Sequence, residues 1–428
     1  MSKIKNKSEL SVNSLRSDAM DILSAGLDAI DTSGAVRKNV IYEKESRMLK
    51  VDGKIFYLSE YKNIYLIAFG KCAVLASQEL EEILGDEIKG GIVLDIQSGY
   101  FKKLQSIVGT HPFPSEDNMR ATAQVVELID KATEDDLVIV VISGGGSSLL
   151  CLPYEISCEN LVKITKVLFE KGANIEEINT VRKHLSQVQG GQMAKLIYPA
   201  SSITLIFSDV PGDDLSVVAS GPMSKDLTVV EDAQSVMKKY DVINLCQIPQ
   251  CELTETPKEE KYFEKIFTCL LVNNAVALKA MQEFAIAKGY KTKIVSKTLS
   301  GEAREVGVFI AKTEIGSKTA LFYGGEATVT VKQNGKGGRN QEVALGALPF
   351  IEEGKVLVAC ASDGVDNTDM AGAIVDGIVR VKAEELKINP QEYLDANNSY
   401  EFFVKVGAHI NTGITGSNIS DLYMLISE

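Results

Sequence analysis

Three glycines and two serines in a row form the first group of residues in this chain that could do chemistry. They directly follow the apolar run Leu137 to Ser143 and comprise Gly144, Gly145, Gly146, Ser147 and Ser148. Glycines leave no Cβ in the way of a ligand, and a serine can cap a following helix, whose free N–H groups favour an anion. The pattern indicates either a phosphate-binding loop or an ordinary strand-to-helix turn. It matches neither the dinucleotide pattern GxGxxG nor the P-loop pattern GxxxxGK followed by Ser or Thr.

Another apolar run leads into a lysine. Lys71 follows the run Ile64 to Phe69 and precedes the helical pattern Ala73 to Leu84. A cation at the start of a helix opposes the helix dipole unless an anion shares the site. Lys71 is therefore either an anion-binding residue or a solvated surface lysine. His111, in a turn-rich segment beside Pro112, is a secondary candidate, because a single histidine next to a proline is more often structural.

Carboxylates gather after a third apolar run, Ile203 to Phe207. Asp209, Asp213 and Asp214 lie in the turn that follows it. Carboxylate oxygens on such a turn are suitable ligands for magnesium and can also handle a proton. The alternative is a solvated turn in which an aspartate caps the next helix.

The densest polar cluster lies in the second half of the chain, where residues 335–342 read GKGGRNQE. It leads into the helical pattern Val343 to Ile351. Flexible glycines beside an arginine at a helix start suit the recognition of a phosphate or a carboxylate, because a guanidinium can bind two oxygens at once. Arg339 is therefore the residue of this cluster that we expect to bind an anion.

Alternating strands and helices position these groups. Four apolar runs end at Lys71, Asp95, Ser143 and Asp209, and each leads towards a helix. This alternation predicts a parallel, doubly wound sheet that binds ligands beyond the carboxyl ends of its strands. Lys71, the glycine-serine loop and Asp209 are then expected at one edge of the sheet.

Two helical patterns complete the first part of the chain. A helix from Ser14 to Ile30 is expected to pack on the first domain. The segment Asn179 to Leu196 is expected to form one amphipathic helix whose basic side, with Arg182, Lys183 and His184, is solvated.

A polar linker from Tyr240 to Lys261 divides the chain into two predicted domains. Residues 1–245 form a Rossmann-like N-terminal domain. Residues 246–428 form a smaller mixed α/β domain that opens with the strand Phe267 to Val272. Glycine and polar clusters recur at strand ends in both halves, which favours an active-site cleft between the domains over scattered surface turns.

The overall composition argues against several classes of protein. The 428 residues include 45 basic and 58 acidic ones, and the net charge of −13 argues against nonspecific binding to nucleic acid or anionic membranes. The N-terminus lacks the apolar core of a signal peptide, and no run reaches the ~18 apolar residues of a membrane span. Seven cysteines without a CxxC pair are typical of reduced thiols. We therefore expect a cytoplasmic protein, monomeric or homodimeric, that binds no nucleic acid and no membrane.

The ordered motifs of the chain resemble those of the class II glycerate 2-kinases, whose C-terminal part is called the MOFRL domain. The motifs are FGKCA, HPFP, ISGGGSSLL, NTVRKHLSQVQGG, SDVPGDDLSVVASGP, GGEATVTV, GKGGRNQE, SDGVDNTDMAGA and TGITGSNISD. The resemblance covers nearly the whole chain and implies a Rossmann-like domain joined to a smaller α/β domain, with ATP, magnesium and D-glycerate in the cleft between them. The chain departs from the usual family pattern in the loop Ser362 to Thr368, which is one residue shorter, and at Ile414, which replaces a proline.

The resemblance also implies roles for individual residues in the phosphorylation of D-glycerate to 2-phosphoglycerate by ATP. Lys71 and Arg339 match the family's proposed catalytic lysine and arginine, which would act on the transferred phosphoryl group and the glycerate carboxylate. Asp209, with Asp213 or Glu326, is expected to bind Mg²⁺ or to accept the hydroxyl proton. The remaining expected contacts are those of Ser143, Gly144 and Asn340 with the substrate, and those of Gly144, Gly145, Gly146, Ser147, Ser148, Asp213, Asn274, Glu326 and Asp363 with the nucleotide.

Other functions stay open at this point. Some relatives of the family carry the label hydroxypyruvate reductase, but that activity requires a nicotinamide site, and no GxGxxG pattern opens a predicted strand-helix unit. A kinase for a related small hydroxy acid would use the same residues. The third class is a binding protein that uses the same cleft without catalysis.

Overall fold

The computed structural model describes residues 3–210, 212–248 and 251–428, and it divides into two compact units. The central unit is Thr32–Leu271. The terminal unit joins residues 3–31 to Val272–Glu428. This division differs from the predicted boundary after residue 245, because residues 3–31 lie in the terminal unit and the described residues between 246 and 271 lie in the central unit.

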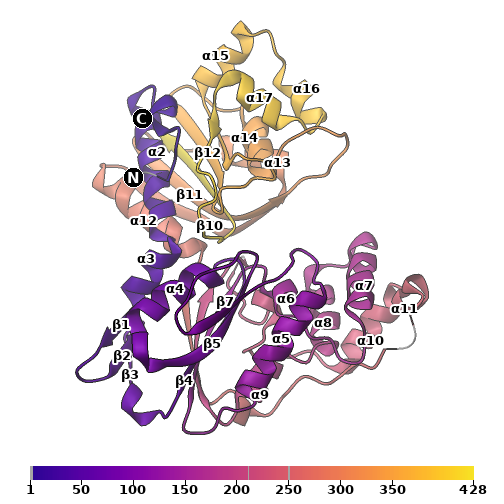
Figure 1. Cartoon of the computed structure of the whole chain (residues 1–428). Coiled ribbons are helices and arrows are strands. Elements are labelled where there is room, and N and C mark those ends of the chain that lie inside the picture. Colours follow the sequence, from indigo (N-terminus) through magenta and orange to yellow (C-terminus); the bar gives the residue numbers. More distant parts are fainter. Residues whose placement is uncertain (1–2, 211, 249–250) are drawn as a thin grey trace. The chain divides into compact units, whose positions relative to one another are not determined.

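A six-stranded sheet forms the middle of the central unit, in the order β6-β5-β4-β7-β8-β9 (Figure 1). Its strands are β4 (Ile64–Phe69), β5 (Ile88–Asp95), β6 (Leu104–Val108), β7 (Leu137–Ser143), β8 (Ser201–Phe207) and β9 (Ile266–Val272). The first five in the spatial order run parallel to one another, which confirms the predicted parallel sheet. Every residue of β7 is buried, as an unbroken apolar run predicts.

Helices cover this sheet, and the described residues include two distinct apolar cores. The helices are α3 (Thr32–Asn39), α4 (Ala73–Leu84), α5 (Glu116–Ile129), α6 (Gly146–Leu149), α7 (Cys158–Glu170), α8 (Ile175–His184), α9 (Gln192–Ile197), α10 (Val230–Lys239) and α11 (Val242–Cys246). One core joins the sheet to α5 and α9, and the other joins α7, α8, α10 and α11, which lie together at one end of the unit in Figure 1. A small antiparallel sheet of β1 (Val40–Glu43), β2 (Met48–Val51) and β3 (Lys54–Tyr57) completes the unit.

Two predictions for this part of the chain are wrong. The strand β9 was expected to open the second domain, but it is part of the first sheet. The segment Asn179 to Leu196 is two helices, α8 and α9, because Gly190 and Gly191 take positive φ angles of 60° and 84° between them. Its basic side is not solvated throughout: Lys183 and His184 are buried.

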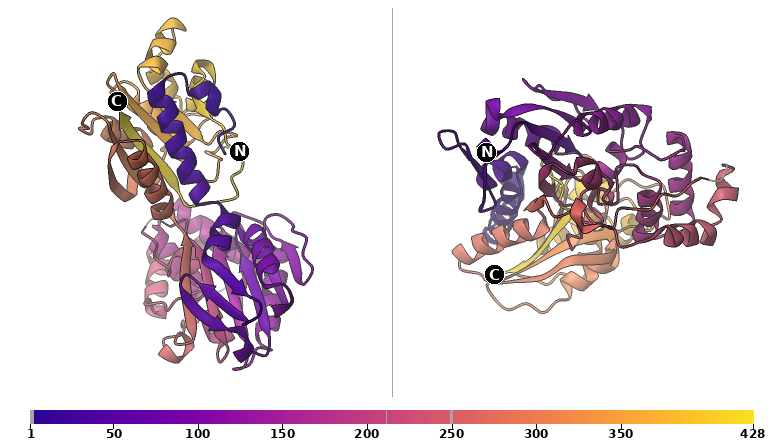
Figure 2. Two further views of the ribbon diagram at one scale, coloured as in Figure 1. Left: turned by 90° about the vertical axis from the view of Figure 1, so that its left-hand side faces the viewer. Right: turned by 90° about the horizontal axis from the view of Figure 1, so that it is seen from below.

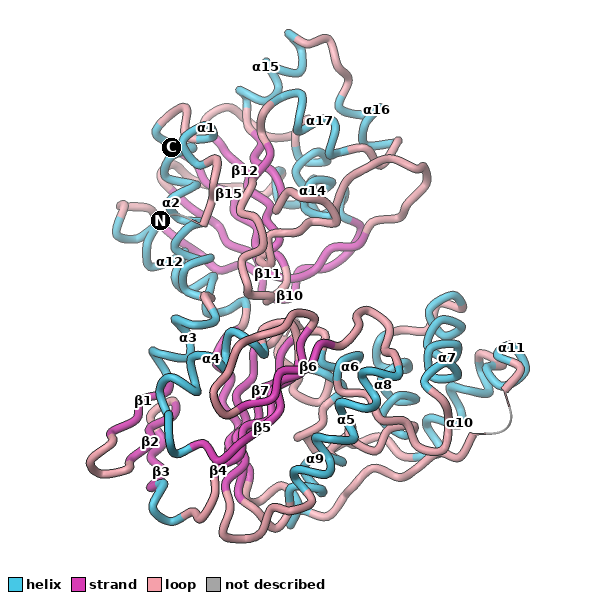
Figure 3. The backbone as a smooth tube through the Cα atoms, viewed as in Figure 1, coloured by secondary structure: helices cyan, strands magenta, loops and turns pink. Residues whose placement is uncertain are grey.

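The terminal unit contains a mixed six-stranded sheet in the order β10-β11-β15-β12-β13-β14. Its strands are β10 (Lys291–Glu302), β11 (Thr319–Thr328), β12 (Lys355–Ala361), β13 (Gly372–Val375), β14 (His409–Ile410) and β15 (Asp421–Ser427). The pair of β10 and β11 is parallel, and the other neighbours are antiparallel. Figure 3 shows the strands as a magenta layer with helices against it. Its helices are α1 (Lys7–Leu10), α2 (Ser14–Ala29), α12 (Asn274–Ala287), α13 (Ala303–Ala311), α14 (Arg339–Ala347), α15 (Gly377–Glu385), α16 (Pro390–Asp395) and α17 (Ser399–Val406).

The helix α2 packs in the terminal unit and not, as predicted, on the first domain. It lies beside α12 in Figures 1 and 2, and a Cβ on Gly26 would come within 2.6 Å of Met281 Cγ. Arg16 donates two hydrogen bonds of 2.6 Å to Asp376, and Lys288 lies 2.7 Å from Asp18. These contacts join residues far apart in the sequence, so the pattern of α2 alone could not place it. No helix in the described ranges is long and apolar enough to cross a membrane.

Candidate active site

The glycine-serine loop connects the buried strand β7 to the four-residue helix α6. Gly145 takes the left-handed conformation, with φ of 83°, which a glycine adopts without strain. A Cβ on Gly146 would come within 2.7 Å of Ala219 Cβ, and a Cβ on Gly70, at the end of β4, within 2.2 Å of Ser143 Oγ. The glycines therefore allow neighbouring strand ends and loops to pack closely. The predicted strand-loop-helix arrangement is confirmed, and its contact with phosphate stays a prediction.

The serine hydroxyls of this loop hold adjacent segments together. Ser143 Oγ accepts a hydrogen bond of 3.1 Å from the Cys72 N–H, and Ser148 Oγ donates one of 2.5 Å to the Pro112 carbonyl. Ser147 Oγ lies 2.9 Å from Ser220 Oγ, whose own hydrogen is donated to Asn179. The loop is thus fixed in place by its own side chains, while the first N–H groups of α6 have no partner within the helix.

Lys71 and His111 lie directly beside this loop. The Lys71 N–H donates a hydrogen bond of 2.9 Å to the Gly144 carbonyl. The ideal Cβ position of Gly145 is 3.2 Å from Lys71 Cγ and 3.1 Å from His111 Cδ2. Partial burial, together with the charge of Lys71, lowers the pKa of His111 to about 4, so its imidazole is neutral at pH 7. His111, a secondary candidate in the sequence, is therefore part of the candidate site.

Asp209 completes the group at the carboxyl ends of β4, β7 and β8. It follows β8 and is partly buried. Burial raises the pKa of the Asp209 carboxyl, and the charge of Lys71 partly opposes that rise. The structure thus brings together Lys71, the glycine-serine loop and Asp209, as predicted from the order of strands and helices. Asp213 lies four residues further along with a positive φ of 58°.

In the terminal unit, Arg339 is held by two carboxylates. It is the first residue of α14, and its guanidinium donates hydrogen bonds of 2.6 and 3.1 Å to Asp421 and one of 2.6 Å to Glu326. Asp421 is fully buried, whereas the Glu326 side chain is 43% exposed. Burial alone would lower the pKa of Arg339, but the charges of Asp421 and Glu326 outweigh it and raise that pKa.

A buried carboxylate caps the start of the same helix. Asp366 accepts hydrogen bonds from the backbone N–H groups of Asn340, at 3.0 Å, and Gln341, at 2.9 Å. The Asn340 side-chain amide bridges Asp366, at 3.1 Å, and Asp421, at 2.9 Å. Burial is the main cause that raises the pKa of Asp366 to about 6, and the nearby Asp421 charge adds to it. Arg339 therefore belongs to a connected polar network whose orientation is fixed from within the unit.

Comparisons with known proteins agree with this architecture. The family described as Domain of unknown function (DUF4147) matches residues 18–250, and the MOFRL family matches residues 319–421. A D-glycerate 2-kinase from Thermotoga maritima is 38% identical, with 96% of this chain and 97% of the relative covered. The chain belongs to the glycerate 2-kinase family. A glycerate 2-kinase from Pyrococcus horikoshii is 37% identical over 95% of this chain and 98% of the relative.

A solved structure supports membership of the glycerate 2-kinase family. The crystal structure of glycerate kinase from Thermotoga maritima matches with a TM-score of 0.84 at 36% identity. The match covers 96% of this chain and 99% of the other. The two-domain α/β fold expected from the resemblance is therefore confirmed.

Several predicted site residues of this glycerate 2-kinase family member are engaged in structural contacts. Asn274 donates a hydrogen bond of 2.7 Å to the Lys297 carbonyl and is buried at the start of α12. Asp363 accepts one of 3.0 Å from the Val365 N–H in a turn. Ser143 and Asn340 are fully buried. The predicted contacts of these four residues with nucleotide or substrate stay predictions.

The sequence analysis missed two functional candidates, Asp366 and Asp421. Both are buried carboxylates that orient the start of α14, yet they lie 26 and 81 residues from Asn340. One signal was available: Asp421 opens an otherwise apolar closing strand, and an aspartate at that place needs a partner. Asp366 gave no comparable signal, because an aspartate in a turn-rich loop is ordinary.

Proposed function

We propose that this member of the glycerate 2-kinase family transfers the γ-phosphoryl group of ATP to the 2-hydroxyl of D-glycerate. The observation that carries the proposal is the grouping of Lys71, the glycine-serine loop and Asp209 at the carboxyl ends of three adjacent parallel strands. Phosphoryl transfer needs mainly positioning and charge stabilisation, and such strand ends are where open α/β sheets bind their ligands.

In this reaction the central unit binds and stabilises the phosphates, and it also accepts the proton of the glycerate hydroxyl. The backbone N–H groups of the loop bind phosphate oxygens, and the Lys71 ammonium stabilises negative charge on the transferred group. The hydroxyl oxygen of glycerate forms a bond to the γ-phosphorus as the bond to the β-phosphate oxygen breaks, and ADP leaves. Asp209 accepts the hydroxyl proton in this scheme, which suits a carboxyl whose pKa burial has raised.

Magnesium fits this donor set as a companion of ATP. Mg²⁺ is commonly held by one or two carboxylates together with substrate phosphates, and Asp209 is a partly buried carboxylate beside the proposed phosphate loop. Asp213 and Glu326 are the other candidate ligands. No group of three His, Cys, Asp or Glu in the described residues could hold a metal by itself. When bound, the ion would neutralise charge on the phosphates.

Arg339 has the second charged role in this proposal. Its side chain is 34% exposed, and its exposed partner Glu326 can be exchanged for a phosphoryl oxygen while buried Asp421 keeps the guanidinium oriented. The idea that the two units form a cleft that closes on ligands stays a prediction. Small-angle scattering with and without ATP, magnesium and glycerate tests it, because closure would reduce the radius of gyration.

One assay panel tests the proposed activity against its alternatives. Coupled ADP release is measured with D-glycerate and other small hydroxy acids, and loss of NADH absorbance is measured with hydroxypyruvate. Turnover highest with D-glycerate supports the proposal, whereas NADH oxidation without ADP release would replace it by the reductase. The loops after β4 and β7 read GKC and GGGSS, and neither offers the GxGxxG pattern of a nicotinamide site.

We also propose that the enzyme acts in the cytoplasm as a monomer or homodimer, since all seven cysteines are free thiols.

A further inference from the structure

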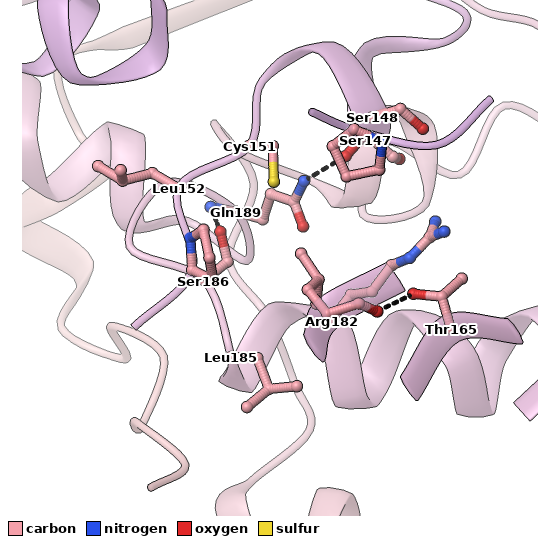
Figure 4. A pocket seen from close by; sticks show the side chains of 12 residues that line it. Ser147, Ser148, Cys151, Leu152, Thr165, Arg182, Leu185, Ser186 and Gln189 are labelled. Carbon is pink, nitrogen blue, oxygen red and sulfur yellow. Dashed lines mark hydrogen bonds between the residues drawn. The ribbon is translucent and has the colours of Figure 1, made fainter. Parts of the chain in front are cut away.

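A narrow pocket adjoins the glycine-serine loop within the central unit (Figure 4). Its volume is about 20 Å³, and its polar wall includes Ser147, Ser148, Thr165, Arg182 and Ser186. Leu152, Leu161 and Leu185 contribute apolar walls. Gln189 ties the pocket to the loop, because its side-chain amide donates hydrogen bonds to the carbonyls of Ser147, at 2.9 Å, and Leu150, at 3.1 Å.

Arg182 is the only charged residue that lines this pocket. It extends from α8, and in Figure 4 its guanidinium points towards the side formed by Ser148 and Thr165. The side chain is half-buried, and within the described ranges its guanidinium forms neither a hydrogen bond nor an ion pair. Burial lowers the pKa of Arg182, with no described carboxylate to offset it. A half-buried cation without a partner still loses part of its hydration, so its place here calls for an anion.

Lys183, the next residue along the helix, is a cation that the fold pairs with a carboxylate, as is usual for a buried charge. Lys183 is buried too, and its Nζ lies 3.1 Å from Asp226 Oδ1. The fold thus neutralises this neighbouring cation, which does not line the pocket. Because the cation in the pocket has no such carboxylate, the missing charge is one that a ligand can supply.

The size and shape of the pocket select the kind of anion. About 20 Å³ is room for one or two water-sized groups, which excludes a nucleotide or a triphosphate chain. A guanidinium binds the two oxygens of a carboxylate in parallel, and the leucine walls suit the carbon chain attached to it. A small carboxylic acid whose carboxylate enters this pocket would keep its remaining atoms close to Ser147 and Ser148.

We infer that Arg182 binds the carboxylate of the hydroxy-acid substrate in the pocket beside Ser147 and Ser148. This inference rests on the proposed kinase function and deepens it. Arg182 then fixes the acid end of glycerate, which leaves Lys71 and Arg339 for the phosphoryl group. The pocket also sets the specificity of the enzyme for hydroxy acids over neutral alcohols.

Steady-state kinetics of Arg182→Met test the role directly. We expect the KM for D-glycerate to rise about 10- to 100-fold, the worth of a charge-assisted bidentate contact, while the KM for ATP stays within about twofold. Arg182→Lys keeps the charge and most of the packing, and it should recover only part of the loss. The matched control is Arg120→Met, an arginine of the same unit whose side chain is 72% exposed. Unchanged glycerate KM in a folded Arg182→Met enzyme, or a rise in ATP KM instead, overturns the inference.

A neutral analogue separates carboxylate recognition from a general structural role. D-glyceramide replaces the carboxylate by an amide of similar shape. The wild-type enzyme should prefer D-glycerate over D-glyceramide by at least tenfold in kcat/KM, and Arg182→Met should lose most of that preference. A structural arginine would instead lower both activities equally, and that result would contradict the inference. The melting temperature of ligand-free Arg182→Met should equal or exceed that of the wild type, because an unpaired, half-buried charge is removed.

Binding measured without ATP distinguishes failure of this inference from failure of the kinase proposal. Isothermal titration of the full chain with D-glycerate should show binding that Arg182→Met loses and Arg120→Met keeps. If the wild type binds glycerate through Arg182 but releases no ADP, the kinase proposal fails and the carboxylate site stands. If ADP release is normal and glycerate binding ignores Arg182, the inference alone fails. Inorganic phosphate binding that equals glycerate binding and depends on Arg182 would also overturn it.

Discussion

Arg182 in the central unit and Arg339 in the terminal unit are in opposite electrostatic states. Arg339 is held by the buried Asp421 and the exposed Glu326, so its guanidinium is oriented and largely neutralised without any ligand. Arg182 and Lys71 form no ion pair within 4 Å in the described part of the chain. The terminal unit therefore contains an arginine, Arg339, whose side chain is already oriented by carboxylates. The central unit contains two cations, Arg182 and Lys71, that can each bind the anionic group of a ligand.

This difference separates two ways of using a cation. A guanidinium fixed by carboxylates needs little reorganisation when charge develops nearby, but its net field is weak until a partner is exchanged. An unpaired cation has its full field and binds anions strongly, at a cost to the stability of the ligand-free protein. We therefore expect changes in the central unit to act mainly on activity and changes at Asp421 to act mainly on stability.

The largest expected effect comes from removing the unpaired charge of Lys71. Lys71→Ala should lower kcat by about 10²- to 10³-fold, because the ammonium stabilises charge on the transferring phosphoryl group. Thermal unfolding should change little. Lys89→Ala, an exposed lysine of β5, is the control. Near wild-type turnover in a folded Lys71→Ala enzyme would show that the loop acts without it.

The two partners of Arg339 should differ in their effect on stability. Asp421→Ala removes the buried acceptor that Arg339, Asn340 and Tyr423 share and should lower the free energy of unfolding by about 3 kcal/mol. Glu326→Ala removes an exposed partner and should cost less than about 1 kcal/mol. Urea unfolding of both variants measures the difference. Equal losses would mean that the exposed contact contributes as much as the buried one.

Arg339→Lys tests whether Arg339 acts through the shape of its guanidinium or only through its positive charge. A lysine keeps the positive charge but cannot bond both oxygens of Asp421 and Glu326 at once, so kcat/KM should fall at least about tenfold. Arg339→Ala should fall further. Kinetics with varied D-glycerate and varied ATP show which parameter changes. Full activity of the lysine variant would mean that Arg339 acts only through its charge.

Asp366 should make the stability of the protein depend on pH. Its pKa is raised from 3.8 to about 6 in the folded protein, so the folded state holds the proton more tightly than the unfolded state. The resulting stabilisation is full below pH 3.8 and is lost as the pH rises through about 6, an effect of about 3 kcal/mol at about 1.4 kcal/mol per pKa unit. Asp366→Asn should therefore show a smaller decline between pH 4 and 7 in urea unfolding. An identical pH profile would place the titration elsewhere.

The parts of the fold that rest on continuous apolar runs were predictable from the sequence. β4, α4 and β7 begin and end at the predicted residues, because buried parallel strands and amphipathic helices leave clear patterns bounded by glycine or polar groups. The clustering of Lys71 with the loop followed from strand order. The two consecutive glycines Gly190 and Gly191 do indicate a break between α8 and α9, but the prediction of one continuous helix ignored them.

Long-range partners were not predictable in the same way. The pattern of β9 shows a strand but not which sheet it joins, and the pattern of α2 shows an apolar face but not that α12 covers it. Arg182 was expected in solvent because the segment around it has the spacing of apolar and basic residues that is typical of an amphipathic surface helix. Only the packing of α7 and of the glycine-serine loop around α8 encloses its side chain.

The membership of both α2 and α12 in the terminal unit sets an order of events on the ribosome. α2 is synthesised before its partner α12, which emerges only after the whole of Thr32–Leu271, on the order of 10 to 50 s later at ordinary elongation rates. The central unit has all of its strands by then and can fold while translation continues. The apolar side of α2, with Leu15, Leu23 and Leu27, has no partner from its own unit during that interval. A nascent-chain chaperone would thus find a binding segment in α2 and release it when α12 has been synthesised.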